Sequence, residues 1–174
     1  MKTWKKVLLA VVGVIGIALA WWLGSPLFIT NRVSEALPTV PVETILAPSA
    51  VPPRDRIVVI TPAIPGFLAE GPFSGFDKLH RATGTARLIK TGEKTYVRFE
   101  EDFTVTNGPD LFVHLGKDGK YDPAVNLGRL KGNEGSQNYE IPAGVNVDEY
   151  SEIWIWCRAF SVPFGKVVLT RAAV

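Results

Sequence analysis

A long uncharged run near the N-terminus constrains the fold of this chain more than any other feature. Three lysines lie within the first six residues, and apolar residues then extend from 7 to 29, with a Gly-Ser-Pro sequence at 24–26. An α-helix needs about 20 apolar residues to cross the hydrocarbon core of a bilayer. The run has no polar face with which a soluble helix would meet water. We therefore predict one N-terminal transmembrane helix that contacts the lipid bilayer through residues 7–29.

The charges around this run predict its orientation. Lysines precede it, whereas Arg32 is the only cation directly after it, which places the N-terminus in the cytoplasm. Trp21 and Trp22 lie near its far end, where amphipathic rings favour the membrane interface. The alternative is a cleaved signal peptide with a cleavage site at residues 18–20. Because the apolar run continues past that site, we favour a single-pass cell-membrane protein with an extracytoplasmic C-terminal domain.

Composition changes twice along the rest of the chain. Residues 31–65 are rich in proline and poor in aromatic residues, which is typical of an extended tether. A short apolar stretch at 57–60 could form an edge strand there, or it could pack on the globular domain. From residue 66 onward, aromatic and β-branched residues are frequent enough to build one core. The sequence thus predicts a cytoplasmic tip and anchor at 1–30, a tether at 31–65 and a globular domain at 66–174.

The globular part has the pattern of an all-β protein. Apolar and polar residues alternate in short stretches, and glycine, asparagine and proline turns separate these stretches. Sustained helical periodicity is missing, although residues 76–81 could make one helical turn. We predict an antiparallel β-sandwich or barrel with strands at 85–90, 95–100, 103–105, 111–115, 137–141, 153–158 and 165–170.

The stretch 153–158 is apolar on both faces. Ile153, Ile155 and Cys157 alternate with Trp154 and Trp156, so each set lies on one face of a strand. Antiparallel strands that are covered on both faces lie in the middle of a sheet rather than at its edge. We therefore predict a central strand, and Cys157, the only cysteine of the chain, lies on it.

Several short stretches of the globular part resemble one family in both identity and order. They are Gly66-Phe67, Leu79-His80-Arg-Ala-Thr-Gly84, Gly108-Pro109-Asp110-Leu111, Leu127-Gly128-Arg-Leu-Lys-Gly132, Gly135-Ser-Gln-Asn-Tyr139, Ile155-Trp156-Cys157, Phe160-Ser-Val162 and Phe164-Gly165. Together they resemble the DM13 (DM-thirteen) domain, a family labelled as an electron-transfer module. The stretch 25–29 also resembles the exit from the membrane helix in anchored bacterial members.

This resemblance implies a β-sandwich module displayed outside the cell membrane. It also implies a marked cysteine, matched here by Cys157, for which a redox role has been suggested. In animals and plants the domain accompanies haem-type or matrix-type modules. The resemblance therefore places the function of this chain in redox or electron-transfer chemistry, with Cys157 as the candidate catalytic thiol.

The residues themselves leave the role of Cys157 open. No second cysteine is present for an intramolecular disulfide. The thiol could be a small core residue, a redox centre, a metal or haem ligand, or one half of an intermolecular disulfide. His80 could bind a cofactor together with Cys157, or it could be a hydrogen-bonded loop residue. We expect His114, on the less apolar face of its strand, to be half-exposed.

Cofactor, enzyme and nucleic-acid motifs give little further guidance. No Cys-x-x-Cys, His-x-x-x-His or Cys-x-x-Cys-His spacing is present, so no metal site is predicted and the cofactor is unknown, with a metal or haem as options. A Gly-x-Ser-x-Gly elbow is missing as well, which argues against an ordinary hydrolase. Whether the chain is an enzyme stays open. The 19 basic residues are scattered and form no stripe, which argues against nucleic acid as a partner.

Two functional hypotheses remain. The first is a membrane-anchored redox or electron-transfer accessory module centred on Cys157. The second is a non-catalytic binding or adhesion module whose loops contact an envelope protein or polymer, and in which Cys157 is only core packing. Accessibility of the thiol in the folded domain distinguishes the two.

Overall fold

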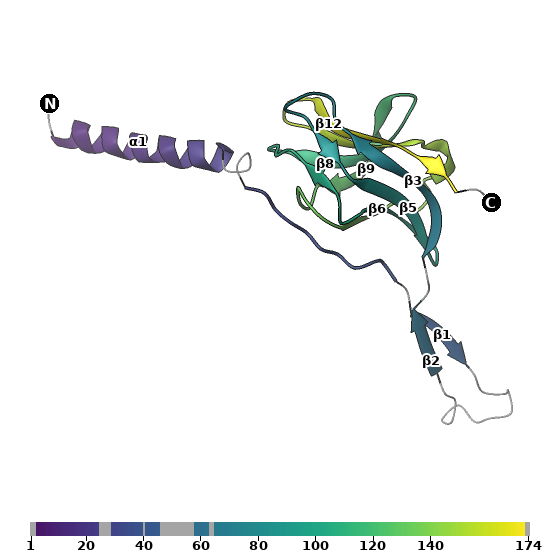
Figure 1. The fold of residues 1–174 in the computed structure, drawn as a ribbon. Coiled ribbons are helices and arrows are strands. Elements are labelled where there is room, and N and C mark those ends of the chain that lie inside the picture. The colour runs from purple at the N-terminus through teal and green to yellow at the C-terminus, as the bar shows by residue number, and fades with distance from the viewer. Residues whose placement is uncertain (1–2, 25–28, 40, 46–57, 63–64, 173–174) are drawn as a thin grey trace.

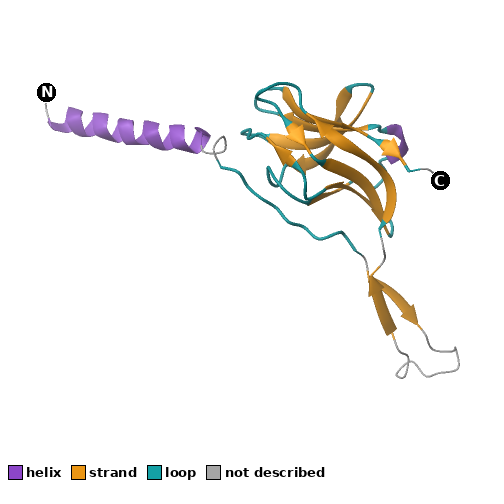
Figure 2. Ribbon diagram, viewed as in Figure 1, coloured by secondary structure: helices purple, strands orange, loops and turns teal. Residues whose placement is uncertain are grey.

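The computed structural model describes residues 3–24, 29–39, 41–45, 58–62 and 65–172. They form a long helix, an extended segment, a small hairpin and a β-barrel (Figure 1). Apart from the helix and one short 3-10 turn at Val147–Glu149, strands and loops make up the described chain (Figure 2). The predicted all-β antiparallel domain behind one N-terminal helix is confirmed.

Helix α1 spans Thr3–Gly24 and stands apart from the barrel (Figure 1). Its section Thr3–Trp21 is long and apolar enough to cross a membrane, and none of that section is buried by other parts of the protein. Such a helix, apolar on all sides and packed against nothing, would expose a large apolar surface if it lay in water. Membrane anchors and secretory signal sequences share this length and composition, so the predicted apolar helix is confirmed at that level.

Eight strands form one antiparallel sheet in the order β10-β6-β5-β3-β12-β11-β8-β9. The bounds are β3 (Gly66–Ser74), β5 (Thr85–Thr91), β6 (Lys94–Phe99), β8 (Leu111–Lys117), β9 (Lys120–Arg129), β10 (Gln137–Glu140), β11 (Glu152–Cys157) and β12 (Val162–Val168). The outer strands β9 and β10 come together, and the Lys131 amide, just after β9, donates to the Tyr139 hydroxyl of β10 at 3.0 Å. The sheet is therefore a nearly closed barrel, one of the two architectures predicted.

Shorter strands complete the described part of the chain. β13 (Thr170–Arg171) pairs with β3, and β4 (Ala82–Thr83) pairs with β7 (Thr104–Val105) as a separate ribbon. The strand predicted at 103–105 therefore lies outside the barrel sheet. β1 (Pro41–Ile45) and β2 (Val58–Pro62) form a hairpin of their own. Residues 58–60 of the apolar stretch predicted at 57–60 therefore pair with β1 and not with the barrel edge, and residue 57 lies outside the described residues. The loop 75–81 contains bends and no helical turn.

The barrel interior is filled by alternate residues of its strands. Ile153, Ile155 and Cys157 are fully buried on the inner face of β11, which pairs with β8 on one side and β12 on the other. The predicted central strand is thus confirmed. Several aromatic rings also fill the core, and Phe99 contacts Phe73 with ring centroids 4.9 Å apart. Burying one such ring fully contributes about 1.5–3 kcal/mol.

The extended segment 31–39 lies against the barrel and is fixed there by hydrogen bonds. The Val33 amide donates to the Glu134 carbonyl at 2.9 Å, and the Glu35 amide donates to the Ser136 carbonyl at 3.0 Å. The Glu35 carboxylate accepts from the Asn138 amide at 2.8 Å and from the Lys131 ammonium at 2.7 Å. Because Asn138 belongs to β10, Glu35 satisfies an amide of an edge strand, which limits pairing of that edge with other chains.

Candidate functional site

Cys157 is the last residue of β11, with Leu111 of β8 and Val162 of β12 as its strand partners. Its side chain points into the barrel and is 0% exposed. Reactive cysteines lie in partly exposed, electropositive surroundings, because the thiolate is the reacting form. The strand partners of Cys157 are apolar, and the thiol belongs to the same hydrophobic core as Ile153 and Ile155. In this geometry Cys157 has the environment of a core residue.

His80 lies in the loop between β3 and β4, at the end of the barrel where β11 ends. Its Nδ1 is 2.7 Å from Oδ2 of Asp77, and its ring meets the Phe164 ring edge-on at 4.6 Å. The bond from His80, helped by backbone amides, lowers the pKa of Asp77 to about 2. Among the described residues the side-chain partners of His80 are thus Asp77 and Phe164, and no hydrogen bond joins His80 to Cys157. Their shared role as cofactor ligands stays a prediction.

The ligand chemistry around these residues is sparse. Within the described ranges, no group of three or more histidine, cysteine, aspartate or glutamate side chains could hold a metal ion. His80 uses one ring nitrogen for Asp77, which leaves its Nε2 as the atom that could meet a ligand. A haem or metal would therefore need ligands beyond the two residues predicted from the sequence.

His114 is buried and not half-exposed as predicted, with only 6% of its surface in contact with solvent. Strand β9 pairs with β8 in the same sheet, and its Tyr121 ring meets the His114 ring at 5.0 Å on the outer face. Burial lowers the pKa of His114, and the bond between its Nδ1 and the Asp122 carbonyl offsets this only in part. The imidazole is therefore neutral near pH 7.

The outer face of β11 carries the two tryptophans. Trp154 is buried, with its indole N–H bonded to Glu152 at 2.9 Å and its ring stacked on Phe76. Trp156 is half-buried and stacks on Tyr121 with ring centroids 4.3 Å apart. Sequence alternation predicted that both faces are covered; Phe76 of the 75–81 loop covers Trp154, and Tyr121 of β9 covers Trp156.

A hollow of about 320 Å³ remains beside these rings. We call it the aromatic hollow, and its lining residues are Gly119, Lys120, Tyr121, Pro123, Trp154 and Trp156. Its rings are held in place by their stacks and by the Trp154–Glu152 bond, so a ligand would meet a preformed aromatic surface. The sequence showed the tryptophans, but it did not show that β9 brings Tyr121 onto them.

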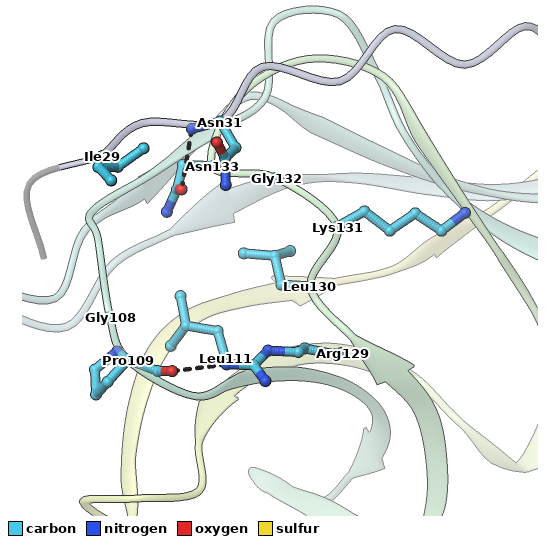
Figure 3. A pocket seen from close by; sticks show the side chains of 10 residues that line it. All are labelled: Ile29, Asn31, Gly108, Pro109, Leu111, Arg129, Leu130, Lys131, Gly132 and Asn133. Carbon is cyan, nitrogen blue, oxygen red and sulfur yellow. Dashed lines mark hydrogen bonds between the residues drawn. The ribbon is translucent and has the colours of Figure 1, made fainter. Parts of the chain in front are cut away.

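A second cavity of about 300 Å³ opens at the end of the barrel near Cys157 (Figure 3). We call it the mouth pocket, and it is lined by Ile29, Asn31, Gly108, Pro109, Leu111, Arg129, Leu130, Lys131, Gly132 and Asn133. Leu111 lines this cavity and is also the strand partner of Cys157, so the cavity lies beside the strand pair that contains the thiol. Figure 3 shows Arg129 turned toward Pro109, whose carbonyl accepts from the guanidinium at 2.8 Å.

Asp110 joins the turns around the mouth pocket. Its carboxylate is 2.9 Å from the Arg158 Nε and 3.6 Å from the Arg129 guanidinium. The Asp110 carbonyl also accepts from the Arg158 amide at 3.0 Å. These bonds hold the β11–β12 turn and the end of β9 against the 106–110 turn. The loops around the thiol are therefore tied to one another.

The family model described as "Electron transfer DM13" matches residues 75–169, which is more than half of the chain. The chain belongs to the DM13 family. Neither the curated proteins nor the solved structures contain a match to it. The DM13 match includes Cys157, His80 and both tryptophans of β11, whereas β3 lies before it. Because β3 pairs with both β5 and β12, the barrel needs residues outside the matched range to form.

Proposed function

We propose that this protein is a single-pass membrane protein whose DM13 barrel is an extracytoplasmic accessory domain of electron transfer. Helix α1 would be the anchor, with the lysine-flanked N-terminus in the cytoplasm, as the positive-inside rule favours. The division into a tip and anchor at 1–30, a tether at 31–65 and a domain at 66–174 belongs to this proposal. The barrel would hold the part of the tether from 31 to 39 through the Val33 and Glu35 bonds.

In this proposal the barrel contributes a binding scaffold, and Cys157 packs in its core. The observation that carries this choice is the complete burial of the thiol between Leu111 and Val162. A thiol in such surroundings cannot meet a redox partner without a local opening of the barrel. The aromatic hollow supplies a surface for a partner on the opposite face of the same strand. The envelope protein or polymer predicted from the sequence would bind there.

The second candidate function is a redox role for Cys157, with His80 as a neighbouring cofactor ligand. Its support is the position of the thiol at the last residue of β11, one strand pair from the mouth pocket. Strand ends open more readily than strand centres. A small opening at Leu111 would let a reagent from the mouth pocket reach the sulfur.

The rate of alkylation of Cys157 distinguishes the two candidates. If the thiol reacts only after global unfolding, a stability of about 5 kcal/mol or more slows alkylation several thousand-fold relative to the unfolded chain. We expect that result in the native chain with iodoacetamide, and the same chain in denaturant is the control. Alkylation within about tenfold of the unfolded rate would refute the packed thiol and favour the redox role.

A further inference from the structure

The chain leaves α1 and arrives at one particular end of the barrel. Thr30 lies in a hollow of about 410 Å³ together with Lys78, Leu79 and Arg81. Ile29 lies at the mouth pocket on the same end, as Figure 3 shows. The 158–161 turn joins this end through the Arg158–Asp110 pair. The loop that follows β3 thus meets the segment that follows the helix, and the loop that follows β11 lies at the same end of the barrel.

Apolar side chains on this end point into solvent. Leu79 is 76% exposed, Phe160 66% and Ile29 52%. Single exposed apolar residues are common on protein surfaces, but a group of them at one place indicates an interaction site. We call Ile29, Lys78, Leu79, Arg81 and Phe160 the rim. Its members come from three segments that are distant in the sequence and lie at the same end of the barrel.

The charge of the rim is positive. Within the described part of the chain, neither the Lys78 ammonium nor the Arg81 guanidinium has an ion-pair partner. The acidic groups nearby are already engaged: Asp77 bonds His80, Asp110 lies between two arginines, and Glu134 is 3.5 Å from Arg32. Lysine and arginine next to protruding apolar side chains are the composition that binds anionic membrane surfaces.

The number of residues between α1 and Thr30 limits the distance between the rim and the helix. Thr30 comes six residues after Gly24, the last residue of α1. Six residues span at most about 22 Å when fully extended. The next residue is already fixed to the barrel, because the Asn31 carbonyl accepts from the Asn133 amide at 2.8 Å. The rim therefore stays near any membrane that α1 enters.

We infer that the rim docks on the outer surface of the membrane, with Leu79, Phe160 and Ile29 in the interface and Lys78 and Arg81 at anionic headgroups. The inference rests on the proposed role of α1 as an anchor. It gives the barrel a fixed orientation, with the mouth pocket toward the lipid and the β5–β6 turn away from it. The bilayer would thus contact the barrel at the rim as well as the anchor helix.

Site-directed spin labelling of the full chain in lipid vesicles tests this orientation. The label goes on Leu79→Cys, and the wild-type chain taken through the same reaction is the blank for Cys157. Glu93→Cys is the matched control, because Glu93 is exposed in the β5–β6 turn at the other end of the barrel. Vesicles of equal parts phosphatidylcholine and phosphatidylglycerol are compared with vesicles of phosphatidylcholine alone.

We expect the Leu79 label to be relaxed more by lipid-soluble oxygen than by a water-soluble nickel complex, and the Glu93 label to show the reverse. The difference at Leu79 should be smaller without phosphatidylglycerol. Phe160→Glu should move the Leu79 label toward water. Val168→Glu should not, because Val168 is an exposed apolar residue at the far end of β12.

Three results would overturn the inference, and they separate it from the anchor. A Leu79 label as accessible to nickel as the Glu93 label, in a chain that resists alkaline carbonate extraction, refutes docking and leaves the anchor intact. A chain that carbonate releases, or whose mature form begins near residue 21, refutes the anchor and docking together. A Leu79 label that is shielded from both reagents, in detergent as well as in vesicles, points to a protein contact instead of lipid.

Discussion

The substitution Cys157→Ser probes the environment of the thiol directly. A serine hydroxyl needs a hydrogen-bond partner, whereas a thiol packs as a small hydrophobe. The ladders to β8 and β12 run along both sides of β11 at this position. Within the described residues every buried side-chain nitrogen or oxygen atom has a partner, so the hydroxyl would be the first without one. Burying an unpaired hydroxyl costs about 1–3 kcal/mol.

The magnitude follows from comparison with Cys157→Ala. Alanine removes the sulfur and leaves a small cavity, at a cost of about 0.5–1.5 kcal/mol. Serine should cost about 1–3 kcal/mol more than alanine because of its unpaired hydroxyl. For a domain of about 100 residues, this difference lowers Tm by about 5–20 °C. Circular dichroism or calorimetry of the full chain in detergent measures it.

Val113→Thr is the matched control for function. Val113 is fully buried in the same core, and threonine there also buries a hydroxyl without changing the thiol. In an electron-transfer assay of membranes, we expect Cys157→Ser and Val113→Thr to lower activity in proportion to their lost stability. A serine variant as stable as the alanine variant would refute the packed thiol. Loss of electron transfer in Cys157→Ser alone, at equal stability, would favour the redox role.

Three further perturbations test the contacts around the site. Burial raises the pKa of Glu35, but the bonds from Lys131 and the Asn138 amide lower it by more, so the pKa lies below its usual value. The stability that Glu35 contributes should disappear as pH falls below 4.5. Glu35→Gln should cost about 0.2–1 kcal/mol at neutral pH, as measured by urea unfolding. Because the pKa of His114 is lowered in the folded state, the unfolded chain binds a proton at a pH where the folded chain does not, and stability should fall as pH drops below 6.5. His114→Gln should remove this dependence of Tm on pH in a series of thermal melts. Trp154→Ala should cost about 3–5 kcal/mol and Trp156→Ala clearly less, because only Trp154 is buried; equal losses in chemical unfolding would contradict this assignment.

Local patterns predicted most of the fold, since alternation and turn residues are local properties of the sequence. The stretch 153–158 predicted a central strand, and β11 is one. The choice between sandwich and barrel depended on whether β9 and β10 meet, which is a contact between distant segments. The docking of residues 31–39 was missed for the same reason. Its bonds join Glu35 to residues about a hundred positions away, and the many prolines nearby indicated only an extended chain.

The candidate site was less predictable than the fold. Cys157 stood out because it is unique, but a single strand cannot reveal what lies across its inner face. His114 was expected to be half-exposed because its neighbours on that face are less apolar, and Tyr121 of the next strand buries it. The aromatic hollow likewise needs β9 to place Tyr121 on Trp156. In both cases the missing information was the register between β8, β9 and β11.

The bonds of residues 31–36 have a consequence for the direction in which the barrel faces. A flexible tether of more than 30 residues would let a domain turn freely above the membrane. Here the chain is already fixed to the barrel at Asn31, through Asn133, and again at Glu35, through Lys131 and Asn138. If α1 is the anchor, the length that matters is therefore the short stretch between Gly24 and Asn31, and not the number of residues between 39 and β3. If α1 is the anchor, the orientation of the domain depends on the hydrogen bonds between residues 31–36 and the barrel, and not on the length of the proline-rich segment.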